Sequence, residues 1–128
     1  MAEFSDFLED ELLDHVFGGS AYTAPADIYL SLSTAVSSDS ARGTEATGSG
    51  YARQAVAFGT ASGGTISNTD VEQFTASGGN FGTVTTTNLE DASTDGNMLC
   101  YDNDFADTAV NDGQTLEFAI GDIDVSLD

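Results

Sequence analysis

Apolar residues recur at steps of three and four near the start of the chain, and acidic residues fill most of the positions between them. This spacing predicts an amphipathic α-helix over residues 4–17, capped by Ser5 and ended by Gly18-Gly19. His15 is expected to lie at the negative end of the helix dipole. The apolar positions of the predicted helix are Phe4, Phe7, Leu8, Leu12, Leu13, Val16 and Phe17.

After Pro25 the period changes to two, which is typical of strands with one buried face. Gly-containing turn signals separate the strand-like segments from one another. Predicted strands cover residues 27–34, 51–58, 64–68, 70–75, 81–89, 97–102 and 114–127, the last bent near Gly121.

These elements predict a mainly β fold. We expect an antiparallel β-sandwich or small barrel of seven to eight strands over residues 27–127, with one N-terminal amphipathic helix packed on it or on a neighbour. A chain of 128 residues fits one hydrophobic core, so residues 1–128 are expected to form a single domain.

The charge of the chain excludes several classes of partner. Two Arg, no Lys, fifteen Asp and seven Glu give a formal net charge of −20. Because neutralising phosphates requires clustered Lys and Arg, we expect no nucleic-acid partner and no anionic membrane. A hydrophobic content of 40% and a single Pro favour a folded domain over disorder.

This acidic composition is typical of a protein that works in molar salt. Along residues 122–128, carboxylates on one strand face are spaced roughly 7 Å apart. That distance lies within the Debye length of roughly 8 Å in physiological buffer but exceeds the roughly 3 Å at 1 M salt. We therefore predict a halophilic protein, with an acidic mesophilic protein as the alternative.

No catalytic constellation is found in the sequence. A lone His15 on the predicted helix and the absence of a G-x-S-x-G motif leave no nucleophile–base pair, so we predict no enzyme activity. Cys100 is expected to be a small buried side chain, and one Cys with one His excludes both an intrachain disulfide and a structural zinc site.

No signal peptide or membrane span is recognised, so synthesis in the cytoplasm of the producing cell is expected.

The best metal candidate is a weak match to a calcium loop. Its ligands would be Asp91, Ser93, Asp95 and Asp102, with Gly96 at the sixth position. The flanking segments, however, are typical of hairpin strands, and Asp95-Gly96 is itself a hairpin turn signal. We therefore predict a turn and no cofactor, with calcium binding as the alternative.

Arg42 and Arg53 are the only Lys or Arg residues in the chain. An Arg retained in so acidic a chain is expected to form a bidentate pair with a carboxylate, inside the fold or across a subunit contact.

Seven apolar helix positions are more than one sandwich face readily covers, so part of the helix is expected to dock on a neighbour. The candidate assembly residues are Phe4, Phe7, Leu8, Leu12, Val16 and Arg53.

Several short segments, spread nearly from end to end of the chain, carry a family resemblance. They include residues 12–17, 21–25 with 28–32, 43–45, 50–54, 82–85, 96–99 and 121–128. These segments resemble the small virion proteins of tailed phages and haloarchaeal tailed viruses, often labelled tail fibre proteins. The resemblance implies a structural protein on the outside of a virion.

The leading hypothesis is therefore a non-enzymatic surface protein of a halophilic tailed virus. It would be a capsid decoration, a turret subunit or a tail component, assembling as a homo-oligomer with other virion proteins. The alternative is a receptor- or carbohydrate-binding module of the tail, whose binding loops would be residues 37–50 and the turn at Asp95-Gly96.

Overall fold

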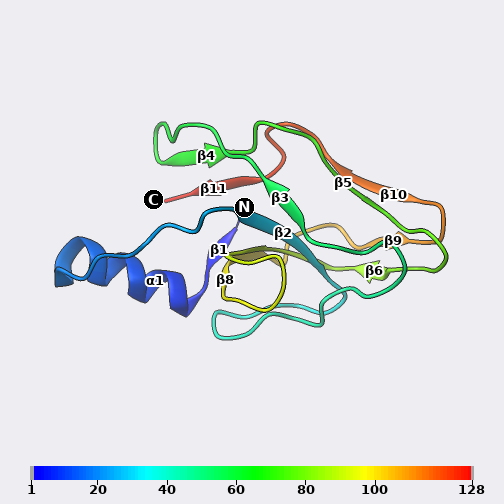
Figure 1. Ribbon diagram of the computed structural model, residues 1–128, viewed down its shortest axis with the longest axis horizontal. Helices are drawn as coiled ribbons and strands as arrows, with labels where there is room; N and C mark the ends of the chain where they lie inside the picture. Colours follow the sequence, from blue (N-terminus) through cyan, green and yellow to red (C-terminus); the bar gives the residue numbers. More distant parts are fainter. Residues whose placement is uncertain (1, 128) are drawn as a thin grey trace.

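The computed structural model describes residues 2–127. A short helical segment near the N-terminus projects to one side of a body made of short strands (Figure 1). The helical elements are α1 (Asp6–Leu13) and the π-helical turn η1 (Asp14–Gly18). The strands are β1 (Glu3–Phe4), β2 (Ile28–Ser33), β3 (Gln54–Val56), β4 (Thr65–Ser67), β5 (Glu72–Thr75), β6 (Gly82–Val84), β7 (Thr86–Glu90), β8 (Met98–Asp102), β9 (Thr108–Val110), β10 (Thr115–Phe118) and β11 (Asp124–Ser126).

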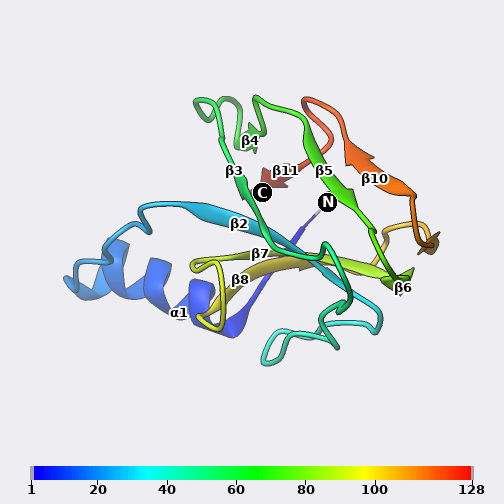
Figure 2. The same ribbon diagram turned by 45° about the vertical axis from the view of Figure 1, so that its right-hand side comes forward.

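All the pairings between these strands in residues 2–127 are antiparallel. A five-stranded main sheet has the order β1-β8-β7-β2-β3, and three two-stranded ribbons pair β10 with β5, β11 with β4 and β6 with β9. The β4–β11 and β5–β10 ribbons lie over one side of the main sheet, and the chain between β2 and β3 lies on the other side (Figure 2). The predicted mainly β antiparallel fold with an N-terminal helix is confirmed.

The core fills the space between the main sheet and the ribbons. Leu30 and Leu32 of β2 and Phe74 of β5 are almost completely buried there. The ring of Tyr51 stacks on Phe74 and meets Phe81 edge-on, an arrangement that adds to the apolar area these rings bury. This core holds the ribbons over the main sheet.

The helix begins and ends where the sequence predicts caps, but its first residue differs from the prediction. Ser5 has an extended backbone, and its Oγ accepts a hydrogen bond from the Leu8 N–H at 3.3 Å. The same Oγ donates to the Met98 carbonyl at 2.6 Å. Phe4 lies outside the helix, in β1 opposite Cys100, because the chain before Ser5 pairs with β8. Gly19, at a φ of 75°, ends η1.

The strand predictions needed two corrections. The segment 81–89 is divided between β6 and β7, because β6 pairs with β9 whereas β7 pairs with β2 and β8. Neither β1 nor β9 was predicted, since each is too short to show a period of two. The predicted bend near Gly121 is confirmed, with a φ of 86°, and it separates β10 from β11.

Candidate functional site

The helical segment has a docked half and an exposed half. Phe7 and Leu8, at its start, pack against the core cluster, as does Phe4 of β1. At the far end Leu13, Val16 and Phe17 expose 57%, 64% and 82% of their surface. These three residues form the helix tip, which extends beyond the β body (Figures 1 and 2). Large apolar side chains exposed together mark an interaction surface.

The predicted assembly residues therefore separate into two groups. Phe4, Phe7 and Leu8 contribute to the core of the chain itself, and Leu12 is half-buried. Val16 belongs to the helix tip. Burial in the core does not exclude an assembly role, so the role of each remains a prediction.

The segment after the helix runs back beside it. The Tyr22 N–H donates to Nδ1 of His15 at 3.0 Å, and the Tyr22 ring meets Phe7 edge-on. Burial, followed by the nearby carboxylates of Asp91 and Glu11, raises the pKa of the Tyr22 phenol. His15 thus holds this return segment against the helix.

An apolar groove opens between α1 and the β4–β11 ribbon. Its volume is about 280 Å³. The walls come from the helix and the ribbon, and its floor comes from the main sheet. The lining residues are Leu8, Ile28, Phe58, Ile66, Leu89, Leu99, Cys100 and Val125. None of these residues carries a charge, in contrast to the acidic composition of the chain.

The two Arg side chains meet at the end of β7. Arg42 Nε and Nη2 bind the two carboxylate oxygens of Glu90 at 2.5 and 2.6 Å. The Glu90 side chain is completely buried and also accepts from Ser31 Oγ at 2.8 Å. The hydrogen bond with Glu90 raises the pKa of the Arg42 guanidinium. A buried carboxylate needs partners of this kind to remain in the fold.

Arg53 forms a second bidentate pair beside the first. Its Nε and Nη2 bind Glu45 at 2.8 and 2.9 Å, and its Nη1 donates to the carbonyls of Ala92 and Asp95. Burial alone raises the pKa of Glu45, but hydrogen bonds from Arg53 and Tyr51 lower it below the ordinary value. The bidentate pair predicted for Arg53 thus lies inside the fold, where it ties residues 45–53 to the β7–β8 turn.

A polar network covers the face of the main sheet that carries Glu90. Asn88 donates through Nδ2 to the hydroxyls of Ser31 and Ser33 at 3.1 and 2.9 Å. Its Oδ1 accepts from Ser37 Oγ at 2.6 Å. The amide of Asn103 joins Ser37 to the same network by binding its backbone on both sides. These hydrogen bonds hold the segment after β2, which the alternative hypothesis treats as a binding loop, against the sheet.

The calcium candidates are not brought together. Both carboxylate oxygens of Asp91 accept hydrogen bonds from Asn97, at 2.7 and 2.8 Å. Asp102 pairs with Thr87 at the other end of the hairpin, which places it roughly 13 Å along the strand from Asp91. Ser93 and Asp95 are exposed in the turn between them. Across residues 2–127, no group of three or more His, Cys, Asp or Glu is placed to hold a metal ion.

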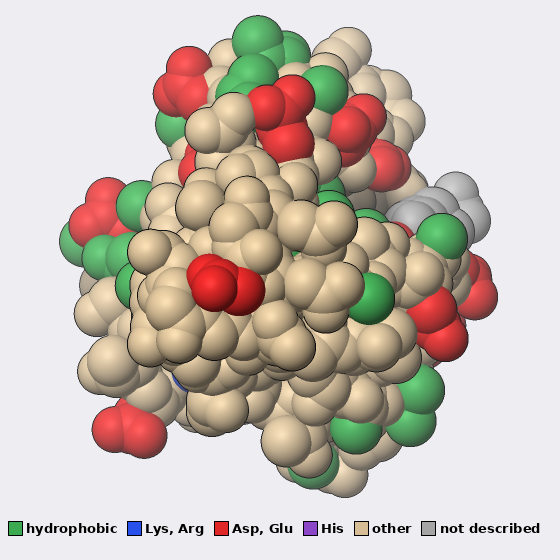
Figure 3. All heavy atoms as spheres, turned by 90° about the vertical axis from the view of Figure 1, so that its right-hand side faces the viewer, with side chains coloured by type: hydrophobic (Ala, Val, Ile, Leu, Met, Phe, Trp, Pro, Cys, Tyr) green, Lys and Arg blue, Asp and Glu red, His purple; other side chains and the backbone are tan. Residues whose placement is uncertain are grey.

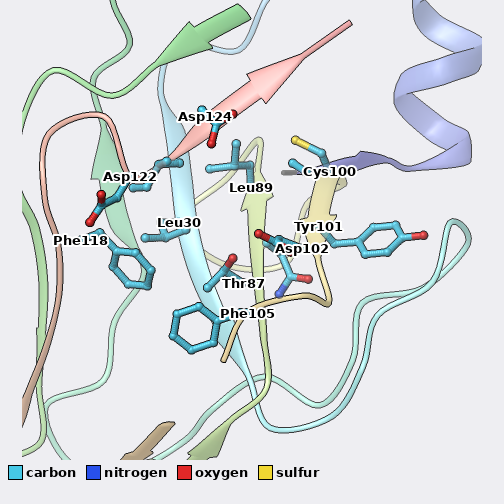
Figure 4. Close-up of a pocket in the computed structure, with 13 residues that line it drawn as sticks. Leu30, Thr87, Leu89, Cys100, Tyr101, Asp102, Phe105, Phe118, Asp122 and Asp124 are labelled. Atoms are coloured by element: carbon cyan, nitrogen blue, oxygen red, sulfur yellow. The ribbon is translucent and has the colours of Figure 1, made fainter. Parts of the chain in front are cut away.

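A small cavity of about 70 Å³ lies under the turn between β10 and β11 (Figure 4). It has room for a few water molecules. Phe105 and Phe118 bound one side, Asp122 lies in the turn, and Asp124 begins β11. Cys100 also lines it, and burial, followed by the charge of Glu90, raises the pKa of this thiol to about 12. At neutral pH the sulfur is a protonated core group.

Large apolar side chains are also exposed outside the helix tip, at Val36, Val71, Ile120 and Leu127. At the end of the molecule away from α1, uncharged side chains and backbone dominate, with carboxylates set apart among them (Figure 3). Within the described residues no helix combines the length and apolar content needed to span a membrane.

Sequence reasoning missed Glu90, Glu45 and the apolar groove. Alternation gave no signal that Glu90 is buried, because a residue that directly follows Leu89 in a strand points to the opposite face. The apolar groove also left no signal in the sequence, because it forms only where residues distant in the sequence meet.

Comparison with known proteins identifies the family. A family model described as podophage GP4 fiber I protein gp80 matches residues 3–126, nearly the whole chain. A search of curated proteins found no match. The matched range includes the helix tip, the two Arg pairs and every strand described above. The chain therefore belongs to the podophage GP4 fiber I protein gp80 family, a family of small tailed-phage virion fibre proteins.

Proposed function

We propose that this protein is a non-enzymatic structural subunit of the virion surface, located in the tail, and that it attaches through its helix tip. The observation that carries the proposal is the exposure of Leu13, Val16 and Phe17 at the end of a projecting helix. In a chain with a formal net charge of −20, three neighbouring exposed apolar side chains are best explained by a partner that covers them.

The absence of enzyme activity is supported by the state of the reactive groups. His15 is engaged with the backbone of the return segment, and the Cys100 thiol is buried with its pKa raised to about 12. A nucleophile requires a base within hydrogen-bond reach, and neither residue is shown with such a partner.

Adaptation to molar salt is supported by where the cations lie. Both Arg residues are paired with carboxylates, Glu90 and Glu45. They cannot neutralise the other acidic side chains, so the repulsion among those acids must be screened by salt. We therefore propose a halophilic host.

Placement in the tail follows from the family, and a capsid decoration or turret is the competing location. Immunogold labelling of particles against this chain, followed by cryo-EM of the labelled region, tests it directly. We expect gold at the tail. Gold confined to the capsid would reject the tail assignment and favour the decoration role.

Attachment through the helix tip is tested by a matched pair of variants. Val16→Ser and Val36→Ser remove similarly exposed side chains, at 64% and 69%, from the helix tip and from the loop after β2. We expect Val16→Ser to fold normally but to be depleted from purified particles, and Val16→Ser combined with Phe17→Ser to be lost from them, whereas Val36→Ser is incorporated like the wild type. Equal incorporation of both variants would reject the proposed attachment.

A further inference from the structure

We propose that the apolar groove between α1 and the β4–β11 ribbon receives the helix tip of a second copy of this chain. This inference rests on the proposed function, since it names the partner that covers the helix tip. The lining includes Leu8 of α1, Ile66 of β4 and Val125 of β11, and a volume of about 280 Å³ is left unfilled between them.

The groove matches the helix tip in size and chemistry. A closed apolar cavity of roughly 150 Å³ is large enough for a benzene molecule. The groove is open to solvent, and its volume of about 280 Å³ leaves room for the ring of Phe17 and one aliphatic side chain such as Val16 to lie in it. All eight residues that line the groove are apolar, as are all three residues of the tip.

A tip cannot occupy the groove of its own chain. Leu8 forms part of the groove wall, and Phe17 lies nine residues further along the same helical segment. At about 1.5 Å per residue this places the tip roughly 13 Å beyond the wall, directed away from the body. The occupant must therefore come from another molecule.

Charge favours insertion into the groove over pairing of two helices. The helix carries Glu9, Asp10, Glu11 and Asp14, so two helices side by side bring like charges together. The groove lining has no charged residue. Between two copies of an acidic chain, the groove is thus a contact that avoids direct repulsion between carboxylates.

The buried area that a stable interface needs is reached only if the helix tip and the groove are both used. Even at roughly 200 Å² each, three side chains supply less than the roughly 800 Å² per partner of a stable interface. Two copies that each insert the tip into the groove of the other place two such contacts in one interface, which brings the buried area to the size that a stable dimer needs. This reciprocal exchange is an isologous arrangement, and it covers the tip and the groove of both copies.

The test uses two full-length single-thiol variants mixed in 2 M KCl. Both carry Cys100→Ala, which keeps the groove lining apolar. One adds Ser20→Cys directly after the tip, so that Phe17 itself is kept, and the other, lengthened by a tag, adds Val125→Cys in the groove. Copper phenanthroline should produce a mixed disulfide between the two variants. In the control, Val36→Cys replaces Ser20→Cys, and we expect at least about tenfold less mixed product, because only random collision brings those thiols together. Equal yields in the two mixtures would overturn the proposal.

Sedimentation velocity of the wild type and of Val16→Ser combined with Phe17→Ser provides an independent readout. We expect the wild type to be larger than a monomer in 2 M KCl and the variant to weaken this association at least about tenfold. A monomeric wild type whose helix-tip variant is still lost from particles would overturn the groove contact but leave the proposed function standing, with another virion protein as the partner.

Discussion

Arg42 binds both carboxylate oxygens of Glu90, a side chain with no exposed surface, through two hydrogen bonds of 2.5 and 2.6 Å. Arg53 Nη1 lies 3.9 Å from the same carboxylate and pairs with Glu45. The two Arg residues of the chain thus meet within one cluster, where they join the segment between β2 and β3 to the β7–β8 hairpin.

The first prediction concerns Arg53. Arg53→Ala should lower the free energy of unfolding by about 3 kcal/mol, because it removes the partner of Glu45 and leaves the carbonyls of Ala92 and Asp95 without their donor. Arg53→Lys should lose less, since an ammonium group keeps the charge but not the fork of donors. Denaturant unfolding at constant molar salt measures both. A loss below about 1 kcal/mol for Arg53→Ala would contradict the prediction.

The second prediction concerns acid stability. Hydrogen bonds from Arg53 and Tyr51 outweigh burial and lower the pKa of Glu45 below its ordinary value of 4.5. The contribution of Glu45 to stability is therefore fully present well above pH 4.5 and is lost as the pH falls through its lower folded-state pKa. Glu45→Gln should make unfolding less dependent on pH in this range, at the cost of stability at pH 7. Unfolding followed by circular dichroism from pH 7 to pH 3 compares the two proteins.

The pKa of Glu72 is shifted in the opposite direction to that of Glu45. Burial, followed by the nearby charge of Asp70, raises the pKa of Glu72. The ionised carboxylate is therefore disfavoured in the fold at neutral pH, and protonation as the pH falls stabilises the protein. Glu72→Gln should raise Tm at pH 7, with a smaller gain in more acidic buffer. A lower Tm at pH 7 would indicate that the Glu72 carboxylate is held by contacts that the amide cannot replace.

The third prediction concerns salt. With a net charge of −20 and both Arg residues already paired, repulsion among the remaining acids depends on ionic screening. Tm should rise steeply between about 0.1 and 2 M KCl, where the Debye length falls below the spacing of carboxylates along a strand. Differential scanning calorimetry over this range is sufficient, and a constant Tm would contradict a halophilic protein.

The last prediction concerns the β7–β8 turn and calcium. Asp91→Asn should fold and enter particles, because an amide oxygen can still accept from the Asn97 N–H and only the exposed hydrogen bond from Asn97 Nδ2 is lost. Gly96→Ala should be harmful, since its φ is 68° and a Cβ would lie 2.4 Å from Asp91 Oδ1. A chelator should leave Tm unchanged at constant molar salt. A drop in Tm with chelator that disappears in Asp95→Asn would instead indicate a calcium site.

Local features of the fold were predictable from the sequence. Ser5 caps the helix, Gly19 ends it, and the alternation in residues 28–33 forms β2, because each depends on neighbours within a few positions. Residues 81–89 illustrate the limit: the segment reads as one strand, yet its two halves pair with β9 and with β2 and β8. Which strands the two halves pair with depends on residues distant in the sequence, and the local hydrophobic pattern carries no information about them.

The candidate site was less predictable for the same reason. The alternation in β2 predicted one apolar and one polar face, and the structure buries Ser31 and Ser33 as completely as Leu32. The sequence could not show that the following Ser- and Gly-rich segment folds back and supplies Ser37 to their network. The sequence predicted that Arg53 pairs with a carboxylate. Only the structure shows that this carboxylate belongs to Glu45.

The pairing of β1 with β8 determines when the N-terminal helix can dock during synthesis. Ser5 bonds to the carbonyls of Met98 and Leu99, more than ninety residues away, so the helix has no docking surface until the ribosome has made most of the chain. Until the helix docks, the apolar side chains of Phe7 and Leu8 are exposed and can contact other molecules, as the helix tip can in the folded protein. Closing so long a loop is slow, and emerging chains are therefore most prone to aggregate in the interval before β8 is complete.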